Sequence, residues 1–247
     1  MDRALWSHSI GEHSMPAWPC PVCQRGHTQL VPKSLRFEET ELSKRQHDEE
    51  AWDPDWIEYV FTAWAQCSQP HCKQVFAMSG VGGVGQYQSE EGENETYAYF
   101  RPMNCQPMPD IITIPQKCPE PVKKELRVAF SLFWKNHEAC AGRIRVALEQ
   151  LMDQLQLPSR RKAKSGKFTD LTLHDRLEVL SQRAPAVGPQ LMALKWLGNA
   201  GSHNGSVSSD ELLDAFEILE HSLTELMEKR SERIAQLAKK LTRKHAK

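Results

Sequence analysis

Hydrophobic positions in the first half of the chain follow the two-residue period of β-strands. Residues 58–66 alternate between two faces, and residues 73–79 form a second apolar strand that stops at the glycine-rich run 80–85. The sequence predicts a hairpin turn at these glycines. Residues 96–101 and 111–114 are predicted to be two further short strands. The first part of the chain is therefore expected to be rich in β-structure.

From residue 117 onwards the hydrophobic period becomes helical. Apolar residues recur at spacings of three and four over residues 120–134, 137–157 and 185–197, which predicts amphipathic helices. Two capping boxes mark the start of further helices. These boxes are Thr172 with Asp175 and Ser208 with Glu211. The helix after the second box is expected to be long, and its distal part could project and pair with another copy.

A proline-rich segment separates the two patterns, with prolines between Pro102 and Pro121. We therefore predict an α+β protein with two domains. Residues 1–116 would form a small β-rich domain, similar to a zinc ribbon, with an acidic insert. Residues 117–247 would form an all-α helical bundle that ends in a long basic helix.

Four of the seven cysteines have the spacing of metal ligands. Cys20 and Cys23 are separated by two residues, while Cys67 and Cys72 are separated by four and lie between two predicted strands. Two such pairs can supply a tetrahedral zinc site that is structural, because four thiolates leave no open position. The alternative is that these cysteines are ordinary small buried residues. The other three show no ligand pairing and are predicted to be packed thiols (Cys105, Cys118 and Cys140).

The overall charge gives no reason to expect attraction to nucleic acid or membrane, since the formal net charge is -1. No apolar run approaches the roughly 20 residues that a membrane span needs. The N-terminus does not have the charged and apolar regions of a signal peptide. The sequence is that expected of a soluble cytoplasmic protein with reduced thiols.

One local segment is strongly basic. It contains Arg160, Arg161, Lys162, Lys164 and Lys167. Several cations in a short mobile loop could contact phosphates of RNA or DNA and gain affinity from counterion release. A solvated connector between helices is the alternative.

Residues 191–203 are the stretch where a helix is expected to give way to a glycine-rich turn after Leu197. Asn199 and His203 would be presented from this turn. They are candidates for chemistry or for a buried polar contact.

Several segments resemble domain-of-unknown-function family 4145. They are residues 139–149, residues 194–203 with a Gly-Asn-x-x-x-His element, the entry segment 114–119 and the cysteine-paired ribbon upstream. The similarity extends from Cys20 to about Met227. It implies a HEPN-like helical bundle, usually dimeric, that is found in bacterial antiviral defence and attached to some restriction enzymes.

The resemblance also implies a mechanism. Active HEPN ribonucleases use an arginine to steady a phosphate and a histidine, a few residues later, to assist attack by the ribose 2′-hydroxyl. His203 matches that histidine and Asn199 the polar residue before it. Residues 196–198 stand where the arginine should be, and Lys195 cannot offer a bidentate fork. An arginine at 143 or 145 could approach in space.

Three functions follow as hypotheses. The first is a zinc-containing, non-catalytic HEPN-like interaction module, a homodimer that binds nucleic acid or a protein partner from a defence or restriction system. The second is a metal-independent endoribonuclease, a toxin or effector with His203 and Asn199 as catalytic candidates. The third is a sensor of a nucleotide or another small ligand.

Overall fold

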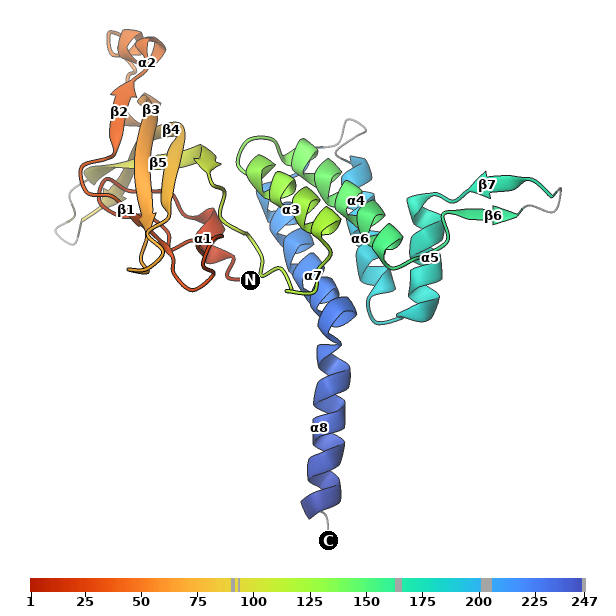
Figure 1. Cartoon of the computed structure of the whole chain (residues 1–247). Helices are drawn as coiled ribbons and strands as arrows, with labels where there is room; N and C mark the ends of the chain where they lie inside the picture. Colours follow the sequence, from red (N-terminus) through yellow and green to blue (C-terminus); the bar gives the residue numbers. More distant parts are fainter. Residues whose placement is uncertain (90–91, 93, 163–165, 201–205, 246–247) are drawn as a thin grey trace. The chain divides into compact units, whose positions relative to one another are not determined.

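The computed structural model describes residues 1–89, 92, 94–162, 166–200 and 206–245. The chain divides between Ile111 and Ile112 into a β-rich unit, residues 2–111, and a helical unit that continues to residue 247 and includes Met1. Figure 1 shows the first unit in red to yellow and the second in green to blue. The predicted α+β class is confirmed.

The β-rich unit is a curled, five-stranded antiparallel sheet. Strands β1 and β2 both pair with β3, and the order continues through β4 to β5. The strands are β1 (Thr28–Leu30), β2 (Arg36–Glu39), β3 (Glu58–Cys67), β4 (Val75–Gln88) and β5 (Asn94–Gln106). Three short helical segments accompany them: α1 (Ala4–Ser7), α2 (Glu41–Gln46) and the 3-10 helix η1 (Pro54–Trp56).

The predicted hairpin turn at residues 80–85 is wrong, because β4 runs straight through these glycines. Their missing side chains make room for aromatic rings of β5. A Cβ on Gly82 would lie 2.6 Å from a ring carbon of Phe100, and one on Gly83 would lie 2.9 Å from the hydroxyl of Tyr99. The glycines therefore serve close packing between the strands and do not reverse the chain. The predicted strand at 111–114 is also wrong: its three isoleucines are buried, but the segment forms no strand.

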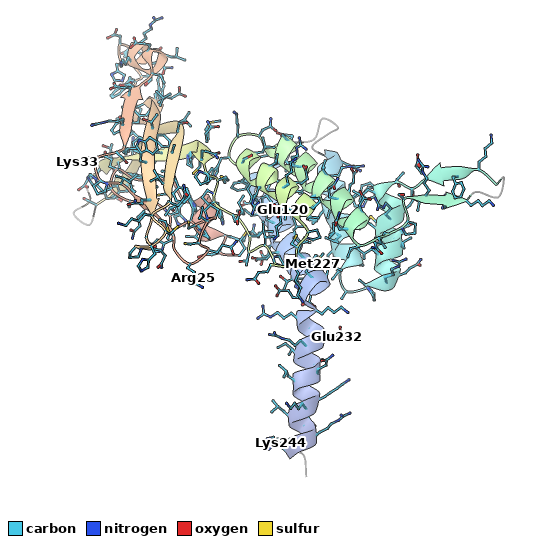
Figure 2. All side chains as sticks on the ribbon, in the orientation of Figure 1. Arg25, Lys33, Glu120, Met227, Glu232 and Lys244 are labelled. Carbon is cyan, nitrogen blue, oxygen red and sulfur yellow. The ribbon has the colours of Figure 1, made fainter. Side chains whose placement is uncertain are left out.

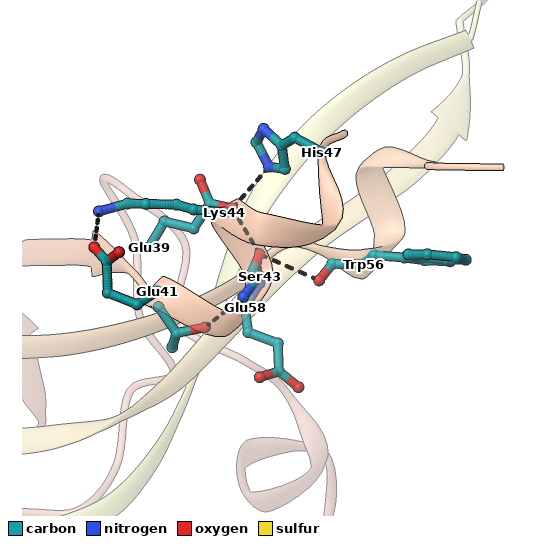
Figure 3. Close-up of polar contacts among 8 residues, drawn as sticks. Glu39, Glu41, Ser43, Lys44, His47, Trp56 and Glu58 are labelled. Carbon is teal, nitrogen blue, oxygen red and sulfur yellow. Dashed lines mark hydrogen bonds and ion pairs between the residues drawn. The ribbon is translucent and has the colours of Figure 1, made fainter. Parts of the chain in front are cut away.

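A buried serine ties α2 to the sheet (Figure 3). The Ser43 hydroxyl donates to a carboxylate oxygen of Glu39 (2.6 Å) and accepts from the backbone N–H of Glu58 (3.1 Å). His47 contacts the same Glu39 oxygen at 2.8 Å. The hydrogen bond from Ser43, and then the charge of His47, lower the pKa of Glu39. These contacts hold α2 beside the end of β2 and the start of β3.

The helical unit contains six helices in its described part. They are α3 (Glu120–Leu132), α4 (His137–Gln154), α5 (Leu173–Arg183), α6 (Gly188–Ala200), α7 (Ser209–Glu228) and α8 (Arg230–His245). Its core includes Phe130 and Phe133, whose ring centroids lie 5.4 and 6.1 Å from that of Phe216. Both predicted capping boxes are confirmed at the starts of α5 and α7.

No helix in the described part of the chain has both the length and the apolar character that crossing a membrane requires.

Three predictions about this unit need correction. The predicted basic loop contains a two-stranded hairpin, β6 (Arg160–Lys162) with β7 (Phe168–Asp170). Helix α6 does not end at Leu197 but continues to Ala200. The long final helix is interrupted at Lys229, where φ is +49°, and α8 starts anew. Every described residue of α8 is exposed, and Figure 2 shows side chains radiating from it between Glu232 and Lys244.

Two Gly→Ala substitutions should change stability in opposite directions. A Cβ on Gly80 would collide with the Arg101 carbonyl oxygen and lie 2.8 Å from the Met103 amide nitrogen. We expect Gly80→Ala to lower the free energy of unfolding of the β-rich unit by about 1–3 kcal/mol. A Cβ on Gly142, inside α4, would meet nothing within 4 Å. Gly142→Ala should raise stability by about 0.5–1 kcal/mol. Urea denaturation measures the free energy of unfolding of each variant. Equal changes for Gly80→Ala and Gly142→Ala would contradict the close approach of β4 and β5.

Candidate functional site

Pairing of β1 with β3 brings the two cysteine pairs together. Thr28 lies opposite Cys67 at the end of this ladder. One residue further along, the N–H of Ser68 donates to the His27 carbonyl (2.9 Å), and the Ser68 hydroxyl accepts from the His27 N–H (3.1 Å). The turn before β1 and the turn after β3 therefore lie side by side, although about 40 residues separate them in sequence.

Each cysteine pair lies on a turn that a backbone hydrogen bond closes. The N–H of Cys20 donates to the carbonyl of Gly26 (2.9 Å), and the N–H of Cys67 donates to the carbonyl of Gln74 (2.8 Å). In both turns the residue after the second cysteine is left-handed, with φ of 53° and 48°. A Cβ on Gly26 would lie 2.5 Å from the Cys67 sulfur, so glycine permits the close approach of the two turns.

The four sulfur atoms have the spacing of a tetrahedral metal site. Cys20 Sγ lies 3.8 Å from Cys72 Sγ, Cys23 Sγ lies 3.7 Å from Cys67 Sγ, and all four lie within 4.8 Å of one another. Metal–sulfur bonds of about 2.3 Å in a tetrahedron require sulfur–sulfur distances of about 3.8 Å. A disulfide would require about 2.05 Å. The cluster therefore fits one metal ion held by four thiolates.

The surroundings of three of the sulfur atoms shift their pKa values in different directions. Backbone N–H groups, first that of Arg25 (labelled in Figure 2) and then that of Gly26, lower the pKa of Cys23 to about 6. Burial raises the pKa of Cys67 to about 12, although the Gln69 N–H donates to its sulfur at 3.4 Å. Burial also raises the pKa of Cys20. A bound cation would offset this cost, because it stabilises each thiolate.

The remaining cysteines are buried and separate from the cluster. Burial raises the pKa of Cys105 and Cys140 to about 12, and that of Cys118 to about 11. These three remain neutral thiols within the packing, as the sequence predicts. His71, the neighbour of Cys72, is exposed and is not one of the grouped ligands.

A second polar contact links α4 to α6. The Arg145 guanidinium donates through Nη1 to the side-chain oxygen of Asn199, and its Nε lies 3.4 Å from a Glu149 oxygen. A Cβ on Gly198 would lie only 2.8 Å from the Arg145 Cβ, so glycine allows this close helix approach. Asn199 therefore has an arginine partner, which is Arg145 of α4. His203 lies outside the described residues.

The basic residues lie at the exposed β6–β7 hairpin. Arg160, Arg161 and Lys162 form β6, Lys167 precedes β7, and Lys164 lies outside the described residues. The structure adds Phe168, which the sequence analysis did not single out and which is 70% exposed. Its position directly after Lys167, at the end of the basic segment, was the available signal.

Family comparisons match the two units separately. Residues 127–244 match the family described as Domain of unknown function (DUF4145). Residues 8–104 match a second family, Domain of unknown function (DUF8608). The DUF4145 match thus runs from within α3 into α8. The predicted extension of this similarity to Cys20 and the cysteine-paired ribbon is wrong, because that segment matches the other family. No curated protein and no solved structure matches the chain.

Removing two ligands should abolish metal binding. We expect about one metal ion per chain in protein purified without chelators, and almost none in Cys67→Ser with Cys72→Ser. Since metal binding contributes to folding, the variant should also lose cooperative unfolding of the β-rich unit. Elemental analysis and thermal denaturation measure both effects. Cys105→Ala removes a buried thiol outside the cluster and should retain the metal. Metal-free wild-type protein would exclude the site.

Cys23 should be the first cysteine of the metal-free protein to react with iodoacetamide at pH 7. Its pKa of about 6 lies below that pH, so the reactive thiolate predominates. The reaction should slow as the pH falls through 6, because the sulfur becomes protonated. Peptide mass spectrometry identifies the modified sites, with buried Cys140 as the unreactive control. Faster modification of Cys67, or no protection by added zinc, would contradict this assignment.

Proposed function

We propose that this protein is a zinc-containing interaction module without catalytic activity. The cluster of Cys20, Cys23, Cys67 and Cys72 carries the proposal, because its four sulfurs have tetrahedral spacing. Four protein ligands complete the coordination shell of the metal. No position remains where a metal-bound water or substrate could react, so the role of the ion is to hold two turns together.

The donor atoms favour zinc. Thiolates are soft ligands, and a tetrahedral set of four sulfurs suits zinc or an iron–sulfur centre. Sulfur–sulfur distances of 3.7 and 3.8 Å match those expected around a single zinc ion. We place the protein in the cytoplasm, where the thiols stay reduced.

The helical unit is proposed to be HEPN-like and to serve binding. In this proposal the Arg145 guanidinium has a structural role, because its contacts with Asn199 and Glu149 hold α4 against α6. We propose that the unit forms a homodimer and binds nucleic acid or a protein partner. The setting in antiviral defence or a restriction system is drawn from the resemblance to DUF4145 alone.

One observation supports a second candidate, a metal-independent ribonuclease. The arginine missing from the local motif is available from Arg145, which contacts Asn199. His203 follows Asn199 by four positions in sequence. An arginine fork could steady a phosphate, while the histidine assists attack by the 2′-hydroxyl. The two candidates differ in whether RNA is cut.

RNA integrity in producing cells and with purified protein distinguishes them. We expect intact RNA for wild type, Arg145→Ala and His203→Ala, because the proposed module does not catalyse cleavage. Arg143 is the matched control: it lies on the same helix but pairs with Glu125 at 3.0 Å. Cleavage by wild type and Arg143→Ala, lost in Arg145→Ala and His203→Ala, would overturn the proposal and establish the ribonuclease.

A further inference from the structure

We propose that the β6–β7 hairpin binds single-stranded nucleic acid, with one base stacked on Phe168. Lys162, Lys167 and Arg161 would hold the adjoining phosphates. This inference rests on the proposed function, since it names the ligand class of one part of the interaction module.

Strand pairing presents the Phe168 ring beside a cation. Phe168 lies directly opposite Lys162, and Arg160 lies directly opposite Asp170, so all four residues share one face of the ribbon. The ring is 70% exposed, and the ribbon extends away from α5 in Figure 1. A two-stranded ribbon has no core of its own, and an exposed aromatic ring on it is available to an incoming planar group.

The charges around the ring favour an anionic ligand. Asp170 pairs with Arg160 at 2.7 Å, which neutralises that arginine within the hairpin. Lys162 remains on the face of the ring, Lys167 directly precedes Phe168 in the chain, and Arg161 pairs with Thr169 on the other face; all three are exposed. Hydrogen bonds from Thr172 are the main cause that lowers the pKa of Asp175, and the positive charge of Arg161 lowers it further. A phosphate beside a base stacked on Phe168 would therefore meet Lys162, with Lys167 next to the ring in the chain and Arg161 adding positive charge to the ribbon.

An aromatic ring among cations fits a single strand better than other partners. Bases stack on exposed rings only when they are unpaired, and such stacking tolerates any sequence. In a duplex the same cations would meet phosphates, but Phe168 would contribute nothing. A protein partner would need about 800 Å² of surface, far more than a ring on three-residue strands offers.

The test compares binding of the full-length protein to a labelled oligouridine, an oligothymidine and a duplex, each of about 12 nucleotides or base pairs. Fluorescence anisotropy gives the affinities. We expect single strands to bind more tightly than the duplex. Phe168→Leu keeps an apolar side chain but removes the stacking ring, and should weaken single-strand binding about 5- to 150-fold. Phe168→Trp should restore it.

Charge variants test the phosphate contacts. Three cations predict a slope of log K against log salt of about -2 for single strands. Replacing Lys162 and Lys167 by Gln should make the slope clearly shallower. Arg160→Gln with Asp170→Asn removes an ion pair without changing net charge, and should leave the affinity nearly unchanged. A variant of α8 with Lys239, Lys240 and Arg243 replaced by Gln should keep the preference for single strands.

Three results would overturn the inference. They are equal weakening of single-strand and duplex binding by Phe168→Leu, full affinity of Phe168→Leu, and no binding of any oligonucleotide by wild type. Circular dichroism should show that the hairpin variants remain folded, as expected for exposed positions. These results are separable from failure of the proposed function, which metal content and RNA integrity test independently.

Discussion

The approach of four sulfur atoms is the constraint around which the β-rich unit is arranged. Two turns distant in sequence meet because β1 pairs with the end of β3, and glycine at position 26 leaves room for the Cys67 sulfur. Burial disfavours negative charge on Cys67 and Cys20, whereas a metal ion would favour it. Coordination of a cation would therefore offset the electrostatic repulsion and desolvation of four thiolates held close together.

Close packing governed by glycine recurs in both units. In β4, aromatic rings from β5 cover glycines, and in α6, Gly198 brings the helix backbone close to Arg145. The second approach makes the Arg145–Asn199 contact possible. In each case a missing side chain sets the distance between elements, and a neighbouring group occupies the space. The role of these glycines is steric: β4 runs on through residues 80–85, and α6 continues past Gly198 to Ala200.

The helical unit presents two different exposed surfaces. The hairpin β6–β7 combines an exposed ring with cations, while α8 is a fully exposed amphipathic helix with Ile234, Leu237 and Leu241 on one side. Lys229, with φ of +49°, separates α8 from the packed helix α7. Both are local secondary structures whose apolar side chains remain exposed in the described chain.

Local sequence signals determined much of this protein. Cysteine spacing selected the four residues that cluster, the capping boxes fixed where α5 and α7 begin, and the change of hydrophobic period separated the sheet from the helices. Tertiary structure decided the rest. From the sequence alone, the glycine run in β4 predicts a turn, but aromatic rings from another strand cover it. Arg145 cannot be told from other surface arginines in the sequence, but α6 packs against it. The basic segment is predicted to be a loop, but in the structure Arg160 pairs with Asp170 across a two-stranded ribbon that leaves Phe168 exposed. These outcomes depend on contacts between different strands or helices, whose geometry the pattern within one element does not encode.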